Sequence, residues 1–254
     1  HERRYDKLVF FVNRLLLLLY DYVIVHCRTA RQQLTESYKL ALGAKTAIIP
    51  HPHFMSCYEN EISRYFARRK LNIATNSTVF LYFGSLREYK GVYQLITAFK
   101  RIKFAEATLL IAGKPHTEAI KKHMLESCRE DERIKARLEF IPEDQIQLYM
   151  NASDVLVAPF KDILTSGSVV LGMGFSRAVI APRRGCIPEI VSEQDGILYD
   201  PEAEDALYNA LKKACEVNLE RMGTHNFQTA RKFDPDLIAK MTHQVYQRCT
   251  LKRY

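Results

Sequence analysis

The chain has 254 residues, of which 47% are hydrophobic and 26% are charged, and its formal net charge is +8 at pH 7. This length allows one large domain or two modest ones, and the composition is that of an ordinary globular protein. The longest apolar run, LLLLLY at residues 15–20, is far shorter than the roughly 20 apolar residues that cross a bilayer. The six scattered cysteines include no CxxC pair, which suits the reducing cytosol and argues against a zinc site.

The excess of positive charge favours an anionic partner, such as a phosphorylated ligand or a membrane surface. Nucleic acid is not expected, since the sequence has neither a basic helical stripe nor an aromatic RNA-binding signature. The basic clusters are short, and for each of them a solvated surface is the expected role.

Short strands and helices are predicted in the first seventy residues. DYVIVHC at 21–27 and KTAIIPHP at 45–52 are predicted strands, and a polar helix at 28–42 lies between them. A basic helical connector at 55–72 follows, and NIATNS at 72–77 is expected to be a linker between two domains.

From residue 78 onwards, strand-like runs alternate regularly with helix-like stretches. TVFLYFG at 78–84 is a strand, and the next helix places Val92, Leu95 and Phe99 on one face. Further strands are predicted at 107–113, 137–142, 154–160, 178–182 and 196–200, and further helices at 116–129, 143–151, 167–176, 202–230 and 234–252. This alternation predicts an α/β fold whose parallel sheet carries helices on both faces, with ligands at the carboxyl ends of the strands.

The segment GSLREYKG, residues 84–91, follows the first of these strands. Gly84 allows a sharp turn and a close backbone approach to a ligand. Arg87 offers a planar fork and Lys90 a point charge for phosphate oxygens, just before a helix N-terminus. On chemistry alone, a plain turn with solvated basic residues explains the pattern equally well.

Two other strand ends carry candidate residues. The TSGS turn, Thr165 to Ser168, can hold a diphosphate with its hydroxyls and amides, although an ordinary N-cap is the alternative. Glu189 can cap a helix or contact a ligand hydroxyl, and this signal is weak by itself. The histidines near strand ends lack the rest of a metal-ligand set, and structural roles are expected for His51, His53 and His116.

In this order and spacing, the strand ends resemble a known family. The chain resembles the C-terminal half of the group 1 glycosyltransferases, in the segments GSLREYKGVYQLITAF, TLLIAGK, FIPEDQIQLYMNASDVLVAPF, TSGSVVLGMGFSRAVIAPRRGCIPEIV and DGILYDPE. Members of this family are retaining, nucleotide-sugar-dependent enzymes of the GT-B fold, in which two Rossmann-like domains face each other. The resemblance covers residues 20–254 and is densest from 78 to 200.

The resemblance implies roles for individual residues. Arg87 and Lys90 would be the catalytic pair that holds the donor diphosphate and stabilises its charge as it leaves. No metal or other cofactor is then expected, and the donor would be a UDP- or GDP-linked sugar. The donor-binding residues would be Gly84, Ser85, Gly113, Lys114, Thr165, Ser166, Gly167, Ser168 and Glu189.

Some positions depart from the family's pattern. Many relatives carry two glutamates eight positions apart where this chain has Ile163 and Leu171, so neither glutamate role can be carried over. Ser85 stands where an arginine is usual. In a sub-branch with a serine-glycine turn the arginine lies beside the lysine motif, as Arg87 does, and this sequence resembles that branch.

Three parts of the chain are predicted: a remnant of the N-terminal acceptor-binding domain at 1–72, the nucleotide-sugar-binding domain at 73–230 and a C-terminal helix crossing back at 231–254. An acceptor-binding domain should have roughly 100–150 residues. A fragment, a short form and one half of a split enzyme therefore stay open, the last with a second polypeptide as partner. The apolar segment at 8–20 is expected to be a core helix of the reduced domain, with a partner or a membrane as the alternative.

The implied function is that of a cytoplasmic hexosyltransferase, peripheral at the inner membrane, where its basic surface meets anionic lipids. It would move a hexose, with retention, from a nucleotide diphosphate sugar to a glycan or lipid-linked acceptor. Two alternatives stay open: a nucleotide-sugar-binding subunit that is inactive without a partner, and a sugar-nucleotide epimerase. For the epimerase, Asp162 and Glu189 are the only obvious carboxylates.

Overall fold

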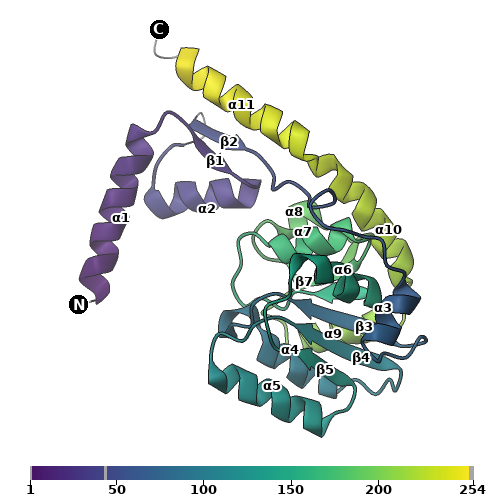
Figure 1. Cartoon of the computed structure of the whole chain (residues 1–254). Coiled ribbons are helices and arrows are strands. Elements are labelled where there is room, and N and C mark those ends of the chain that lie inside the picture. The colour runs from purple at the N-terminus through teal and green to yellow at the C-terminus, as the bar shows by residue number, and fades with distance from the viewer. Residues whose placement is uncertain (1, 43–44, 252–254) are drawn as a thin grey trace. The chain divides into compact units, whose positions relative to one another are not determined.

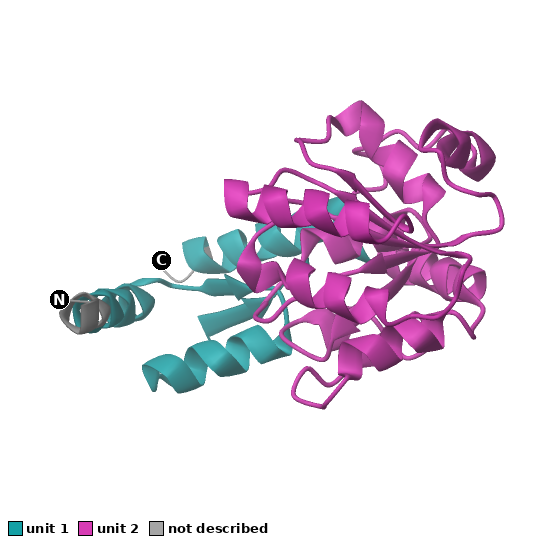
Figure 2. Cartoon of the chain, turned by 90° about the horizontal axis from the view of Figure 1, so that it is seen from below, with its two compact units in different colours: residues 1–52, 233–254 teal, residues 53–232 magenta. Residues whose placement is uncertain are grey.

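The structure is a computed structural model that describes residues 2–42 and 45–251. The chain divides into two compact units (Figure 2). Unit 1 comprises residues 1–52 and 233–254, and unit 2 comprises residues 53–232. The predicted site residues all belong to unit 2.

Unit 1 is a small α/β assembly of α1 (Glu2–Leu19), β1 (Val23–Val25), α2 (Arg28–Tyr38), β2 (Thr46–Ile48) and α11 (Pro235–Leu251). Its two strands pair in parallel, with Val23 opposite Thr46. The apolar stripe predicted for the last helix packs here, because Ile238 and Val245 share a small buried cluster with Ile49.

The prediction that residues 8–20 form a core helix is wrong, because most of their apolar side chains are exposed. Leu17 is buried, whereas the exposed large side chains are Leu8, Val9, Phe10, Phe11, Val12, Leu15, Leu16, Leu18, Leu19 and Tyr20. These residues surround the helix on every side, and α1 has described contacts with α2 on one side, where Phe10 stacks on Tyr38 at 5.2 Å between ring centroids. Among the described residues, no helix is long and apolar enough to cross a membrane.

Unit 2 is built around a six-stranded parallel sheet (Figure 1). Its strands are β3 (Thr78–Phe83), β4 (Ala107–Ala112), β5 (Ile134–Arg137), β6 (Val155–Val157), β7 (Ala178–Pro182) and β8 (Gly196–Tyr199). Its α-helices are α3 (Arg64–Lys70), α4 (Val92–Lys100), α5 (Glu118–Glu130), α6 (Glu143–Ala152), α7 (Gly167–Gly174), α8 (Ile187–Ile190), α9 (Ala206–Ala214) and α10 (Leu219–Ala230). Short 3₁₀ turns occupy η2 (Glu88–Lys90) and η3 (Arg231–Phe233).

The strand order is β5-β4-β3-β6-β7-β8, so the chain builds outward from β3 and then returns to its other side with β6. Phe80 of β3 lies opposite Leu109 of β4 on one side and Val155 of β6 on the other. The order therefore reverses between β3 and β6, and this is the position where doubly wound sheets bind their ligands.

Alternate residues of β3 enter two different apolar layers. Val79 and Leu81 pack in a cluster with residues of α6 and α7, whereas Phe80 and Tyr82 pack with residues of α4, α5 and α9. Because successive side chains of a strand point to opposite faces, helices cover both faces of the sheet. The predicted α/β fold with a doubly wound parallel sheet is confirmed.

Two predicted elements are shifted or shortened. The strand predicted at 137–142 is β5 at 134–137, because Ile134 fills the core while Phe140 is 71% exposed. The helix predicted at 55–72 is confined to α3, because Ser63 caps its start by accepting the Phe66 N–H. Just before that cap, the backbone N–H of Ile62 bonds to Gln147 instead of to a helical carbonyl.

The unit boundary and the helix count near residue 210 also differ from expectation. Unit 2 begins at residue 53 and not at 73, because α3 packs on α6 and its Ala67 belongs to the buried core of unit 2. The helix predicted at 202–230 is two helices, α9 and α10, and Asn218 begins the second by accepting the Arg221 N–H at 2.9 Å.

Candidate functional site

The loops that follow β3 and β4 meet at the carboxyl edge of the sheet. Gly84 has φ +123° and Gly113 has φ +154°, a region that side-chain-bearing residues rarely adopt. A Cβ atom on Gly113 would overlap the Gly84 carbonyl. Glycine at position 113 therefore lets the two loops touch, and the positive φ of Gly84 fits the sharp turn expected there; its approach to a ligand stays a prediction.

Backbone hydrogen bonds continue this contact. The Leu86 N–H donates to the Lys114 carbonyl at 2.9 Å, and the His116 N–H donates to the Leu86 carbonyl at 3.0 Å. The Tyr82 hydroxyl donates to the Ser85 carbonyl at 3.1 Å. The first half of the segment 84–91 is thus fixed against the loop after β4.

The second half of that segment is fixed against the loop after β6. The Lys161 N–H donates to the Tyr89 carbonyl at 2.9 Å. Gly91 has φ +73°, and a Cβ atom there would overlap the Pro159 carbonyl oxygen. The loops after β4, β3 and β6 therefore form one continuous rim across the point where the strand order reverses.

Lys90 and Arg87 give this rim an uncompensated positive charge. The Lys90 Nζ lies 3.1 Å from Ser85 Oγ, and Arg87 is exposed. No carboxylate pairs with either cation in the part of the chain that the structure describes. Burial lowers the pKa of Lys90, and the nearby positive charge of Arg87 lowers it further. An anion bound here would relieve both effects, so the arrangement is suited to a phosphate group.

The TSGS turn lies at the start of α7. Ser166 is buried, its Oγ accepts the Val169 N–H at 3.2 Å, and it lies 3.1 Å from Ser168 Oγ. Ser166 therefore has the N-cap role that the sequence analysis gave as the alternative. Thr165 is half-buried and Gly167 is exposed, so the turn itself remains accessible.

A further contact joins the loop before α7 to the loop after β7. The Cys186 N–H donates to the Leu164 carbonyl at 2.7 Å. Gly185 has φ +58°, and a Cβ atom there would overlap the carbonyl of Ile163. The two loops pack backbone against backbone, which is why a glycine stands between Arg184 and Cys186.

Glu189 is not brought together with Lys90 by any contact in the described part of the chain. It lies on α8, is exposed, and lines a cavity of about 410 Å³ with residues of α10. Its donor-binding role stays a prediction, as do the roles of the other candidate residues.

The histidines have identifiable structural contacts. Within unit 2, His53 Nδ1 accepts the Met55 N–H at 3.3 Å, and within unit 1, His51 Nδ1 lies 2.8 Å from the Pro52 carbonyl oxygen. Among the described residues, no group of three or more His, Cys, Asp or Glu side chains could hold a metal ion. A metal-free site stays a prediction.

Sequence reasoning missed several residues that shape the rim. Tyr89, Pro159 and Lys161 act through their backbones, and a role of the backbone cannot be predicted from the residue type. Gly91 gave a detectable signal, since a glycine that separates a basic turn from an apolar helix indicates a left-handed backbone or a close approach.

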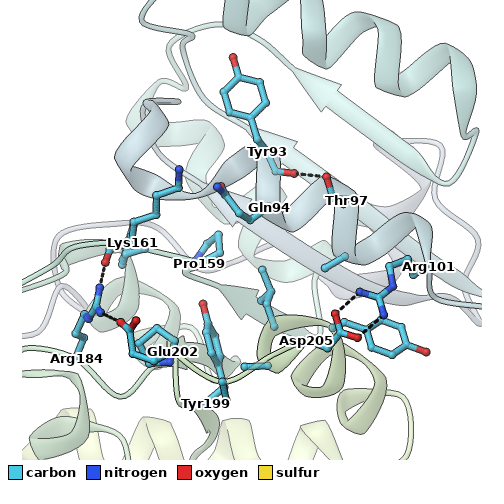
Figure 3. A pocket seen from close by; sticks show the side chains of 17 residues that line it. Tyr93, Gln94, Thr97, Arg101, Pro159, Lys161, Arg184, Tyr199, Glu202 and Asp205 are labelled. Carbon is cyan, nitrogen blue, oxygen red and sulfur yellow. Dashed lines mark hydrogen bonds and ion pairs between the residues drawn. The ribbon is translucent and has the colours of Figure 1, made fainter.

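A separate cavity of about 570 Å³ lies between α4, the loop after β6 and the segment that joins β8 to α9 (Figure 3). None of the predicted site residues lines it. Lys161 belongs to both regions, because its N–H holds the rim while its side chain lines this cavity.

Comparison with known proteins shows a matching family and several relatives. Residues 77–216 match the family model described as "Glycosyl transferases group 1". GDP-mannose:glycolipid 4-beta-D-mannosyltransferase from Xanthomonas campestris is 30% identical over 134 residues, which are 52% of this chain and 38% of that protein. Lipopolysaccharide 1,2-N-acetylglucosaminetransferase from Salmonella typhimurium is 26% identical over 185 residues, which are 68% of this chain and 48% of that protein.

Solved structures of the same fold match most of the chain. Sucrose-phosphate synthase from Thermosynechococcus elongatus has a TM-score of 0.83 at 21% identity and covers 97% of this chain and 63% of its own. Anabaena HepE in complex with UDP and glucose has a TM-score of 0.78 at 19% identity and covers 95% of this chain and 66% of its own. The chain thus spans less than two thirds of the length of each of these four proteins.

Proposed function

Because the chain belongs to the glycosyl transferases group 1 family, we propose that unit 2 binds a nucleotide diphosphate sugar for transfer of a hexose to an acceptor. The family match at residues 77–216 lies wholly within unit 2. The observation that carries the proposal is the pair Arg87 and Lys90, which no described carboxylate neutralises, on a loop held at the reversal of strand order.

In the proposed reaction, the bond between the sugar C1 and the diphosphate oxygen breaks, and the acceptor hydroxyl oxygen bonds to C1. The hydroxyl proton passes to the departing diphosphate. Negative charge grows on the diphosphate as it leaves, and the fixed cations of Lys90 and Arg87 lower the barrier by stabilising that charge. The proposal requires no metal ion.

The relatives suggest the substrate classes. The Xanthomonas relative is named for GDP-mannose and a glycolipid, and the HepE structure contains UDP and glucose. We propose a UDP- or GDP-linked hexose as donor and a glycan or lipid-linked acceptor. A basic protein that acts on a lipid-linked acceptor would work at an anionic membrane surface, and we place this one on the cytoplasmic side.

Retention at C1 is part of the proposal, and it rests on the sequence resemblance. The name of the Xanthomonas relative specifies a β-linked mannose product. The measurement to make is therefore an NMR determination of whether the new linkage in the first transfer product is α or β, with an α-linked nucleotide sugar as donor. A β-linked product would refute retention while leaving glycosyl transfer intact.

The donor site is tested by calorimetric titration of the chain with UDP, GDP and ADP in the absence of metal. We expect one of them to bind, and Lys90→Ala to weaken that binding by about 10- to 100-fold, because charge-assisted hydrogen bonds contribute about 1.5–3 kcal/mol each. Lys122→Ala is the matched control, since that side chain is 80% exposed on α5. Equal affinities in the wild type and in Lys90→Ala would contradict the proposed role of this loop.

A second candidate function is that of a donor-binding subunit, which catalyses sugar transfer only together with another polypeptide. The observation that favours it is that the matched part of the chain covers 38% and 48% of the length of the two curated relatives. Nucleotide diphosphate release that appears only after a second polypeptide is added would select it. The epimerase alternative has no comparable support, because none of the described cavities is lined by both Asp162 and Glu189.

A further inference from the structure

The cavity between α4 and α9 adjoins the candidate donor rim through Pro159 and Lys161, but none of the candidate donor residues lines it. Its volume of about 570 Å³ falls within the roughly 300–1,000 Å³ of small-molecule sites. We propose that this cavity is a second ligand site, which binds one monosaccharide unit of a glycan.

Aromatic and proline side chains form the apolar part of the lining. Tyr199 ends β8 and Tyr208 lies in α9, and Pro159 and Pro201 add two further flat surfaces, whereas the Tyr93 ring turns away from the cavity and packs against His123 (Figure 3). A pyranose ring has an apolar face of C–H groups that packs against surfaces of this kind, in the way that aromatic rings bury apolar area. The lining therefore offers platforms on more than one side of a sugar ring.

Two carboxylates in the lining are held in fixed positions (Figure 3). Arg101 donates to both oxygens of Asp205, at 2.5 and 2.6 Å, and its guanidinium lies 4.2 Å from the ring centroid of Tyr208. Arg184 pairs with Glu202 in the same lining. Each carboxylate oxygen keeps lone pairs that its arginine does not use, and adjacent hydroxyls of a sugar can donate to them.

Three further polar groups complete the lining, from Gln94, Lys161 and Tyr199. The Tyr199 hydroxyl is directed into the cavity (Figure 3). None of the three side chains makes a hydrogen bond to protein within residues 2–42 and 45–251, which the structure describes. Burial raises the pKa of Tyr199, so its hydroxyl stays a neutral donor. A ligand hydroxyl would satisfy these groups.

The charge of the lining favours a sugar over an anion or an apolar molecule. Three cations (Arg101, Lys161 and Arg184) face two carboxylates (Glu202 and Asp205), a net charge of +1. A phosphate would meet the two carboxylates, and an apolar ligand would desolvate polar groups without replacing their hydrogen bonds. Sugar hydroxyls both donate and accept, and they match this mixed array.

The test is saturation-transfer difference NMR of the 254-residue chain with methyl α-mannoside, methyl β-glucoside, N-acetylglucosamine and cellobiose, each at roughly 10 mM. We expect at least one to bind with a dissociation constant of about 1 mM, a value typical of weak small-ligand sites. Tyr199→Phe should weaken it about 3- to 10-fold through loss of one hydrogen bond. The double variant Gln94→Ala with Lys161→Ala should abolish it, and Lys90→Ala should leave it unchanged.

The substituted Gln94 and Lys161 side chains are exposed, so the variants should fold, and thermal unfolding checks this. Failure of all four saccharides to bind would overturn the proposal, and so would binding that survives in the double variant. Signals that disappear in Lys90→Ala, or that UDP displaces, would place the sugar at the donor rim and would also overturn it. Because the cavity variants do not touch Lys90, UDP binding and saccharide binding can fail independently.

Discussion

Replacing Gly91 by alanine tests whether the loop after β3 depends on its close approach to the loop after β6. The new Cβ would lie 1.8 Å from the Pro159 carbonyl oxygen, whereas ordinary contact begins at 3.4 Å. The φ of +73° adds about 1–2 kcal/mol for a residue with a side chain. Overpacking of a tight site costs about 1–3 kcal/mol more, so we expect a total destabilisation of about 2–5 kcal/mol.

Relief of this overlap should also displace the neighbouring Lys90. A displaced Lys90 would make a longer and weaker charge-assisted bond to a phosphate, so affinity for the bound nucleotide should fall together with stability. Urea unfolding measures the first effect and calorimetry with the bound nucleotide the second. Gly167→Ala is the control for stability, since its Cβ would have an ordinary contact at 3.9 Å. A Gly91→Ala variant as stable as the wild type, with unchanged affinity, would refute the reasoning.

Two further predictions concern charges in unit 2. Arg87→Gln should weaken nucleotide binding, and it should raise the pKa of Lys90, because the positive charge of Arg87 is one cause of the lowered pKa of Lys90. Lys90 would then lose its proton, and the variant its affinity for nucleotide, at a higher pH than in the wild type. A shift of this affinity loss to lower pH would contradict the proposed interaction between the two cations. Arg68→Met should destabilise unit 2 by about 1–3 kcal/mol, because Asp154 loses the guanidinium that lies 2.7 Å away and keeps Arg64 as its remaining ion-pair partner. Chemical denaturation of the wild type, Arg68→Met and the control Arg69→Met, whose side chain is exposed, measures the second prediction. Equal stabilities of Arg68→Met and the control would show that other groups compensate the charge of Asp154.

Most of the sheet of unit 2 could be predicted from local sequence. The strand 178–182 was predicted with the bounds that the structure has, since AVIAP is apolar at every position and is buried on both faces. The edge strand β5 was misplaced because an edge strand pairs on one side, so its apolar content is low. Ile134 supplies the buried side chain that anchors it, and that single residue is a weaker signal than the run LEFI that follows.

The rim could be predicted in part. A glycine directly after a predicted strand indicates a sharp turn at that position. This holds for Gly84 and Gly113, which both have a positive φ, because the backbone angle is a local property of each position. The contact of Gly91 with Pro159 joins residues far apart in the chain, and no local pattern encodes it. The same holds for the Arg68–Asp154 pair and for the cavity between α4 and α9. It also holds for α1, whose apolar sequence predicted burial although most of its large apolar side chains are exposed.

The exposed apolar residues of α1 have a consequence for how the chain behaves in solution. At low ionic strength the net charge of +8 keeps copies apart, because electrostatic repulsion reaches about 30 Å at 0.01 M salt. At 0.1 M salt that reach falls to about 10 Å, and contact between apolar helices of two copies then gains the advantage. Added salt should therefore promote self-association of this basic chain, and light scattering along a salt series would record it.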